Sequence, residues 1–213
     1  MTTRLSAPNR TMRRTPTQQR SRDTVEYIIE AATRVLAKFG WAKFTTNEVA
    51  RLAGVSVGSL YQYFPSKLAL AEAIRQRHLD VVLSALPDPD SRDSAISLET
   101  RVANLIDGVI TAHSNNQMLH RVLLTEVPLA GRANFQAFEA EYLRRYQALI
   151  DACSNRRNDA HDSMAAHILS AAVEGAVHAA ARHGKIDSPE LKAELNCLVC
   201  AYLGARLGRA AIE

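Results

Sequence analysis

Aromatic side chains are scarce in this sequence, at 6% of 213 residues, and no strand-like alternation of apolar and polar residues persists along it. β-Sheets favour aromatic and β-branched residues, whereas the abundant Ala and Leu favour packed helices. No internal repeat appears, and the apolar fraction of 47% suffices for an ordinary core. The sequence therefore predicts an all-α globular protein of one or two domains.

Cysteine is also rare, with Cys153, Cys197 and Cys200 as the three examples. An odd number of cysteines without a secretory signal predicts reduced thiols and a cytoplasmic location. The Cys197–Cys200 pair lacks a second pair to complete a zinc site. We expect these thiols to be buried as small apolar residues, with redox sensing as the alternative.

Several other functional classes lack their sequence signals. No apolar run approaches 18 residues, so no membrane-spanning segment or membrane partner is expected. No nucleophile–base motif, phosphate loop or metal-ligand spacing is present, so we expect no enzyme, no metal and no cofactor. The remaining classes are binding and regulatory proteins.

The charge of the chain is unevenly distributed. Residues 1–86 contain 13 Lys and Arg against six Asp and Glu, whereas residues 87–213 contain 13 against 16. A basic first part on a mildly acidic remainder indicates a polyanion-binding head, although solvated basic faces are common. We predict a flexible basic arm at 1–21, a DNA-binding domain with a linking helix at 22–86, and an effector-binding and dimerisation domain at 87–213.

The arm contains Arg10, Arg13, Arg14 and Arg20. It resembles a transit peptide in composition, but Pro8, Pro16 and weak amphipathic periodicity argue against that interpretation. Entry into the minor groove of DNA and loose electrostatic attraction are both open for this segment.

Apolar residues recur at helical spacing along the whole chain, and Gly and Pro interrupt the pattern. An apolar face from Val25 to Phe39 ends at Gly40, a short helix follows Thr45, and Pro87 begins a loop. Nine helices and no sheet are predicted. Their approximate limits are 25–39, 46–53, 57–63, 67–86, 98–110, 119–127, 135–149, 163–182 and 189–207.

The segment from Thr45 to Phe64 has the pattern of a helix-turn-helix. Thr45 and Glu48 form a capping box, and the helix that follows is expected to bury Val49, Leu52 and Ala53. Gly54 makes the turn and Ser56 caps a second helix to Tyr63, whose Leu60 and Phe64 are expected in the core. Such a unit places its second helix in the major groove of DNA.

These residues resemble the N-terminal signature of the tetracycline-repressor (TetR) family. The resemblance covers roughly residues 24–75 and includes Phe39-Gly40, Ala53-Gly54-Val55-Ser56, Gly58-Ser59-Leu60-Tyr61 and Ser66-Lys67. It implies a nine-helix homodimer with a divergent effector-binding body. It also implies a DNA-contacting set, namely Thr45, Thr46, Val57, Gly58, Ser59, Tyr61, Gln62, Tyr63 and Lys67.

Within this set the chemistry of the side chains suggests a division of roles. Thr46, Tyr61, Tyr63 and Lys67 suit phosphate oxygens, with core packing as the alternative for the two tyrosines. Val57, Ser59 and Gln62 suit base edges, and the Gln62 carboxamide can pair with adenine.

The body offers weaker signals. Ala171, Gly175 and Ala179 permit close helix approach, and the resemblance implies that helices eight and nine form the dimer interface; packing within one chain is the alternative. Polar residues on apolar helices are candidates for an effector site: His120, Arg121, Tyr142, Tyr146, His167, Glu174 and His178. The stripe of His167, Glu174 and His178 is compatible with a ligand or metal site, with a polar dimer seam and with exposure to solvent.

The sequence thus predicts a DNA-binding transcriptional regulator, specifically a ligand-responsive repressor that binds a palindromic operator as a homodimer. The alternative is an architectural DNA-binding protein of the same fold that needs no effector.

Overall fold

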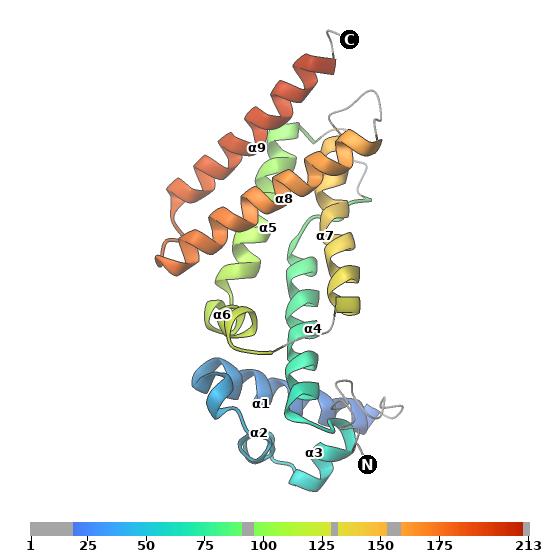
Figure 1. Cartoon of the computed structure of the whole chain (residues 1–213), viewed down its shortest axis with the longest axis vertical. Helices are drawn as coiled ribbons and strands as arrows, with labels where there is room; N and C mark the ends of the chain where they lie inside the picture. Colours follow the sequence, from blue (N-terminus) through green and yellow to red (C-terminus); the bar gives the residue numbers. More distant parts are fainter. Residues whose placement is uncertain (1–18, 91–95, 129–131, 153–158, 211–213) are drawn as a thin grey trace, which may run out of the picture. The chain divides into compact units, whose positions relative to one another are not determined.

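The computed structural model describes residues 19–90, 96–128, 132–152 and 159–210, and across these ranges it contains nine helices and no strand (Figure 1). The predicted all-α, nine-helix fold is therefore confirmed. The helices are α1 Gln19–Lys43, α2 Thr46–Ala53, α3 Val57–Tyr63, α4 Lys67–Ala85, α5 Leu98–Ser114, α6 Gln117–Thr125, α7 Arg132–Asp151, α8 Asp159–Arg182 and α9 Pro189–Ala210.

The helices divide into two compact units. Unit 1 comprises residues 1–79 and 118–131, and unit 2 comprises residues 80–117 and 132–213. These two units are defined by their internal packing. The predicted boundary between residues 86 and 87 separates a DNA-binding domain from an effector-binding domain, and it stays a prediction. Residues 1–18 of the predicted arm lie outside the described residues. Residues 19–21 form the first turn of α1, and the predicted functional limit of the arm at residue 21 stays a prediction.

Unit 1 is built on one apolar core. Ile28 and Leu36 of α1 meet Phe44, Leu60 and Phe64 there, all without solvent exposure. The predicted core positions Leu60 and Phe64 are thus confirmed. Leu119, Val122 and Leu123 of α6, with Val127 just after it, complete the same core.

Two residues predicted to be buried in unit 1 are not. Leu52 is 44% exposed because α2 turns Val49, Ala50 and Ala53 inward, which leaves Leu52 on its other side. Phe39 is also exposed, and the Lys38 ammonium lies 5.2 Å from the centre of its ring.

Gly40 interrupts α1 as predicted, but the chain resumes helical structure as far as Lys43. Its backbone has φ 70° and ψ 176°, a conformation open essentially to glycine alone. The Trp41 amide that follows donates to the Glu126 carboxylate at 2.9 Å. The kink therefore ties the end of α1 to the segment after α6, within unit 1.

Unit 2 packs α5, α7, α8 and α9 around a second apolar core that includes Ile106, Tyr146 and Leu169. Gly108 permits a close approach of backbones, because a Cβ at this position would lie 2.4 Å from the Ala85 carbonyl oxygen. α8 and α9 lie side by side (Figure 1). Several helix limits differ from prediction by a few residues; in unit 2, for example, α8 begins at Asp159 and α9 extends to Ala210.

One described helix, over Asp162–Arg182, is long and apolar enough to cross a membrane by length and composition. The expectation of no such segment considered continuous apolar runs, whereas Ala, Val, Ile and Leu interspersed with polar residues raise the mean hydropathy of this helix without one. A core helix of a water-soluble protein passes the same criterion, so the observation is weak evidence for a membrane.

The predicted burial of the thiols is wrong for Cys197, which is exposed on the outer side of α9. Cys200 is partly buried against the core of unit 2, and this burial raises the pKa of its thiol. Cys153 lies outside the described residues.

Candidate nucleic-acid interface and effector site

The turn between α2 and α3 is held by side-chain caps and backbone hydrogen bonds. The Thr45 hydroxyl accepts from the Glu48 amide at 3.2 Å, which confirms half of the predicted capping box. The Glu48 carboxylate pairs with Arg51 instead of reaching back, and the hydrogen bond from Arg51 lowers the pKa of Glu48. Gly54 follows in the left-handed region at φ 67°, and the Ser56 hydroxyl caps α3 by accepting from the Ser59 amide at 3.0 Å.

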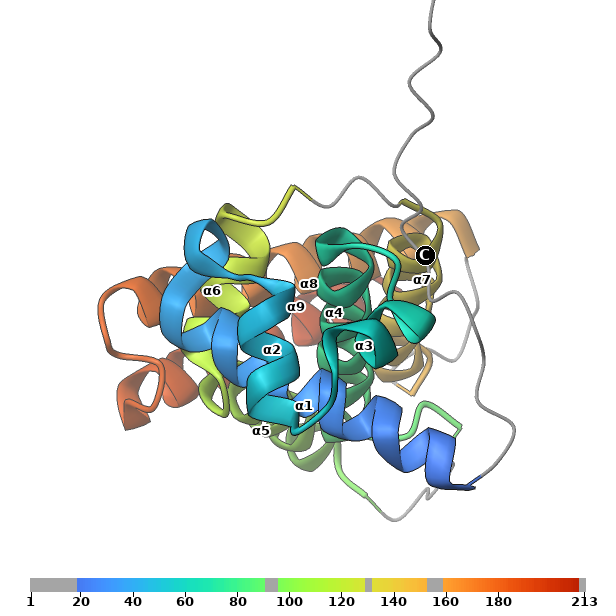
Figure 2. The ribbon, with the colours of Figure 1, turned by 90° about the horizontal axis from the view of Figure 1, so that it is seen from below.

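The short helix α3 presents one face to the core of unit 1 and another to solvent. Leu60 and the following Phe64 anchor the inner face. On the outer face Val57 is 38% exposed and Tyr61 41% exposed, and Gln62 is exposed as well. Figure 2 shows α2 and α3 at the surface in the view from below. A short exposed helix on a fixed turn is the form that enters a major groove.

Part of the predicted DNA-contacting set is linked in the structure. The Thr46 hydroxyl, on the first residue of α2, lies 3.1 Å from the Tyr61 hydroxyl on α3. Both groups are accessible, and together they offer hydrogen-bond donors suited to one phosphate oxygen. Thr45 and Gly58 are exposed, whereas Ser59 and Tyr63 are partly buried and the Ser59 hydroxyl lies 2.8 Å from that of Ser56.

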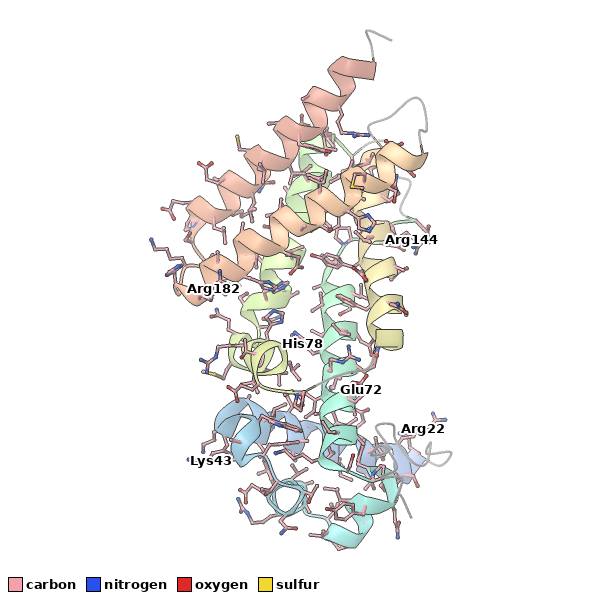
Figure 3. All side chains as sticks on the ribbon, viewed as in Figure 1. Arg22, Lys43, Glu72, His78, Arg144 and Arg182 are labelled. Carbon is pink, nitrogen blue, oxygen red and sulfur yellow. The ribbon has the colours of Figure 1, made fainter. Side chains whose placement is uncertain are left out.

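Lys67, the first residue of α4, is more firmly held than the sequence suggested. Its ammonium donates to the Trp41 carbonyl oxygen at 2.7 Å and lies 3.9 Å from the centre of the Trp41 ring. Burial lowers the pKa of this ammonium. A lysine has three N–H donors, so the group can hold the end of α1 and still donate to a phosphate. Lys43, labelled in Figure 3, is an exposed cation at the same end of α1.

Unit 2 contains a compact polar cluster in its otherwise apolar interior. The Tyr142 hydroxyl donates to Glu174 Oε1 and lies 3.2 Å from the Tyr146 hydroxyl. Glu174 Oε2 lies 3.3 Å from Nε2 of His113 and 3.2 Å from Nε2 of His178. Four of the seven residues predicted for an effector site are therefore brought together.

The groups of this cluster change one another's acidity. Burial raises the pKa of Glu174, but hydrogen bonding and charge from His113 outweigh it, so the net pKa is lowered. Burial lowers the pKa of His113, and the hydrogen bond and charge of Glu174 more than reverse this. The pKa of His178 is lowered, chiefly by burial. The pKa values of Tyr142 and Tyr146 are raised, also chiefly by burial, so both phenols stay protonated.

Of the other three predicted effector residues, two belong to unit 1 and one is exposed on α8. His120 and Arg121 belong to unit 1, where His120 Nδ1 lies 2.9 Å from Nε2 of His78, a residue labelled in Figure 3. Arg121 is exposed and donates to the Met118 sulfur. His167 is exposed on α8, with its Nδ1 2.9 Å from the Ser163 carbonyl oxygen.

His113, which the sequence did not single out, is a buried member of the polar cluster, with 3% of its surface exposed. It stands on the buried face of α5, where Val102, Ile106 and Val109 continue the apolar stripe. A single histidine on an apolar helix face was the available signal, and by itself it does not distinguish a packed residue from a functional one.

Unit 2 also has an open hollow of about 790 Å³, bounded by α5, α7 and the segment after α4. Arg101, Arg144 and Asp151 are among the residues that line it, and Arg144 is labelled in Figure 3. None of the seven predicted effector residues contributes to its lining.

Comparisons with known proteins agree with this architecture. Residues 28–74 match the family described as bacterial regulatory proteins, tetR family, and residues 97–203 match the family described as tetracyclin repressor-like, C-terminal domain. The chain is 28% identical over 108 residues to the nucleoid occlusion factor SlmA of Haemophilus influenzae, which is 51% of this chain and 49% of that protein. It is 40% identical over 58 residues to the HTH-type transcriptional regulator TtgR of Pseudomonas putida, 27% of this chain and 28% of that one. The chain thus matches about half the length of these curated relatives, or less.

Solved structures show the same fold. A tetR-family transcriptional regulator from Streptomyces coelicolor superposes with a TM-score of 0.70 at 19% identity, covering 90% of this chain and 89% of that one. The C-terminal family match alone spans half of the chain, and the N-terminal match contains α2 and α3. The chain therefore belongs to the TetR family of bacterial regulatory proteins.

Proposed function

We propose that the protein is a ligand-responsive repressor that binds a palindromic operator as a homodimer in the cytoplasm. Residues 22–86 carry the DNA contacts, with Tyr61 and Lys67 on the phosphate backbone and Gln62 on base edges. Residues 87–213 carry the dimer contacts and the effector site. The observation that carries the proposal is the exposed outer face of α3, fixed to its unit by Leu60 and Phe64.

The proposed dimer interface is the outer surface of α8 and α9. Met164 is 61% exposed on α8 and Leu198 is 47% exposed on α9. A Cβ added at Gly175 or Gly204 meets no atom of the described residues within 4 Å. Small and apolar residues without a cover in their own unit favour packing against a second copy over packing within one chain.

The proposed effector site is the polar cluster of Tyr142, Tyr146, Glu174 and His178, extended by His113. Buried polar groups are costly unless they are satisfied, and sites that bind small molecules place a few such groups in apolar surroundings. A ligand that binds the two states of the repressor with different affinities shifts the balance between those states. The repressor's affinity for DNA then changes by the ratio of the ligand's two affinities.

A second candidate is an architectural protein that spreads along DNA without an effector. One observation favours it, namely the 28% identity to a protein named as a nucleoid occlusion factor. Both candidates use the same face of α3, so binding to DNA alone does not separate them.

Footprinting on the DNA upstream of the protein's own gene tests the proposal. A repressor protects one palindrome of constant length as the protein concentration rises, and a small molecule from a metabolite panel abolishes the protection. Protection that lengthens with concentration, and that no small molecule reverses, supports the architectural candidate instead.

A further inference from the structure

Two helices of unit 2 bring three metal-ligating side chains together. Glu174 and His178 stand four residues apart on α8 and so share one helix face. His113 reaches the same point from α5, which packs against α8. One carboxylate oxygen, Glu174 Oε2, lies 3.3 Å from Nε2 of His113 and 3.2 Å from Nε2 of His178.

The surrounding groups orient these atoms in the way that outer-sphere partners orient metal ligands. Nδ1 of His113 lies 2.8 Å from the Val109 carbonyl oxygen, and because a carbonyl only accepts, this nitrogen carries a proton. The remaining nitrogen, Nε2, then points at the Glu174 carboxylate. The second oxygen of Glu174 accepts the hydrogen bond of the Tyr142 hydroxyl, which leaves Oε2 for another partner. Ligating histidines and carboxylates are commonly held by a backbone carbonyl and a hydroxyl of this kind.

The separations also suit a small divalent ion. Bonds of about 2.0–2.1 Å to nitrogen and oxygen in a tetrahedral zinc site place neighbouring ligand atoms about 3.3 Å apart. The two nitrogen–oxygen distances of this cluster have that length. A ligand nitrogen of His113 and one of His178 lie within 4.8 Å of each other. Closing this pair to about 3.3 Å needs a shift of at most about 1.5 Å. His178 is the less buried of the two, with 30% of its side chain exposed against 3% for His113.

We propose that His113, Glu174 and His178 form a binding site for a divalent transition-metal ion of the zinc class. Two imidazoles and one carboxylate are ligands that such ions accept, and three protein ligands leave a position open for water or for an effector atom. The competing interpretation is a proton on Nε2 of His113, which makes the cluster a buried ion pair and needs no metal. Metal binding and DNA release are separate measurements, so failure of this site leaves the proposed repressor function open to its own test.

Titration of the untagged, full-length protein with Zn²⁺ tests the site after treatment with a chelator. We expect isothermal calorimetry to give one Zn²⁺ per chain, and Co²⁺ to give the intense visible absorption of a tetrahedral ion. Glu174→Gln keeps the acceptor for Tyr142 but removes the charge, and His178→Ala removes a partly exposed ligand. Each is expected to weaken Zn²⁺ binding at least tenfold and to abolish the Co²⁺ absorption.

His183→Ala is the matched control, because His183 is an exposed histidine just beyond α8. This variant is expected to bind Zn²⁺ like the natural protein. Tyr142→Phe keeps all three ligands and is expected to weaken binding about tenfold through loss of orientation. The proposal is overturned if the natural protein binds no stoichiometric Zn²⁺, or if Glu174→Gln and His178→Ala, with unchanged circular dichroism, bind it equally well.

Discussion

The ammonium of Lys67 lies 2.7 Å from the carbonyl oxygen of Trp41 and 3.9 Å from the centre of its indole ring. Lys67 therefore joins the start of α4 to the end of α1. The same group is a proposed phosphate contact, so this one side chain is expected to contribute both to the stability of the fold and to the affinity for DNA.

Lys67→Ala is expected to lower both quantities. Loss of the hydrogen bond and of the cation–π contact is expected to cost about 1–2 kcal/mol of unfolding free energy, measured by urea denaturation. Loss of one phosphate contact is expected to weaken binding to all DNA sequences and to reduce the salt dependence by about one unit. Lys185→Ala, an exposed lysine of unit 2, is the control; an unchanged salt dependence in Lys67→Ala contradicts the phosphate role.

Gly40 and Gly54 both have positive φ, but they are expected to differ in their tolerance of alanine. At Gly40 the ψ of 176° is strained for alanine, and the new Cβ would lie 2.7 Å from Glu126 Oε2, the acceptor of the Trp41 amide. Gly54 is in the ordinary left-handed region with open space around it. We expect Gly40→Ala to cost about 2–3 kcal/mol and Gly54→Ala about 1 kcal/mol. The urea midpoints followed by circular dichroism decide this, and equal midpoints contradict the account of the kink.

Gln62 is exposed on the outer face of α3, where its carboxamide is a proposed base contact. Gln62→Ala is expected to lose about 1–3 kcal/mol of discrimination at particular base pairs while retaining most of its affinity for nonspecific DNA. Selection from randomised operators measures the preference at each position. Gln136→Ala on α7 serves as the control. An unchanged base preference in Gln62→Ala contradicts the proposed contact between Gln62 and base edges.

Gly175 has open space around it on α8, so an arginine fits there in a single chain but obstructs a second copy. Gly175→Arg is expected to shift the mass in solution from twice 23.4 kDa to that of one chain, with its helix content retained. Light scattering after size exclusion measures this. Ala140→Arg, on the exposed side of α7, is expected to stay dimeric. A dimer of unchanged stability in Gly175→Arg places the interface elsewhere.

The helix-turn-helix of α2 and α3 could be predicted from the sequence, because the residues that form it interact over only a few positions in the chain. Thr45, Gly54 and Ser56 fix the caps and the turn locally, and the spacing of Leu60 and Phe64 fixes the inner face of α3. The predicted burial of Leu52 and Phe39 was wrong because both lie near helix ends. Too few turns remain there for the spacing of apolar residues to define the buried face.

Only some of the contacts in the polar cluster of unit 2 could be predicted from the sequence. Glu174 and His178 share a helix, so their spacing predicted their proximity. The contact of His113 with Glu174 depends on the packing of α5 against α8, which no local pattern encodes. The sequence also offered His120 and Arg121 as effector candidates; both belong to unit 1, and their role stays a prediction.

Methylation interference on the footprinted operator tests the central claim most directly, because it reports which groove α3 enters. Methylation of guanine N7 blocks the major groove, whereas methylation of adenine N3 blocks the minor groove. We predict interference at guanine N7 in two symmetric half-sites about 10–10.5 base pairs apart, the spacing of two recognition helices on one face of DNA. Interference confined to adenine N3, or spread without two-fold symmetry, contradicts a dimeric repressor that reads DNA through α3.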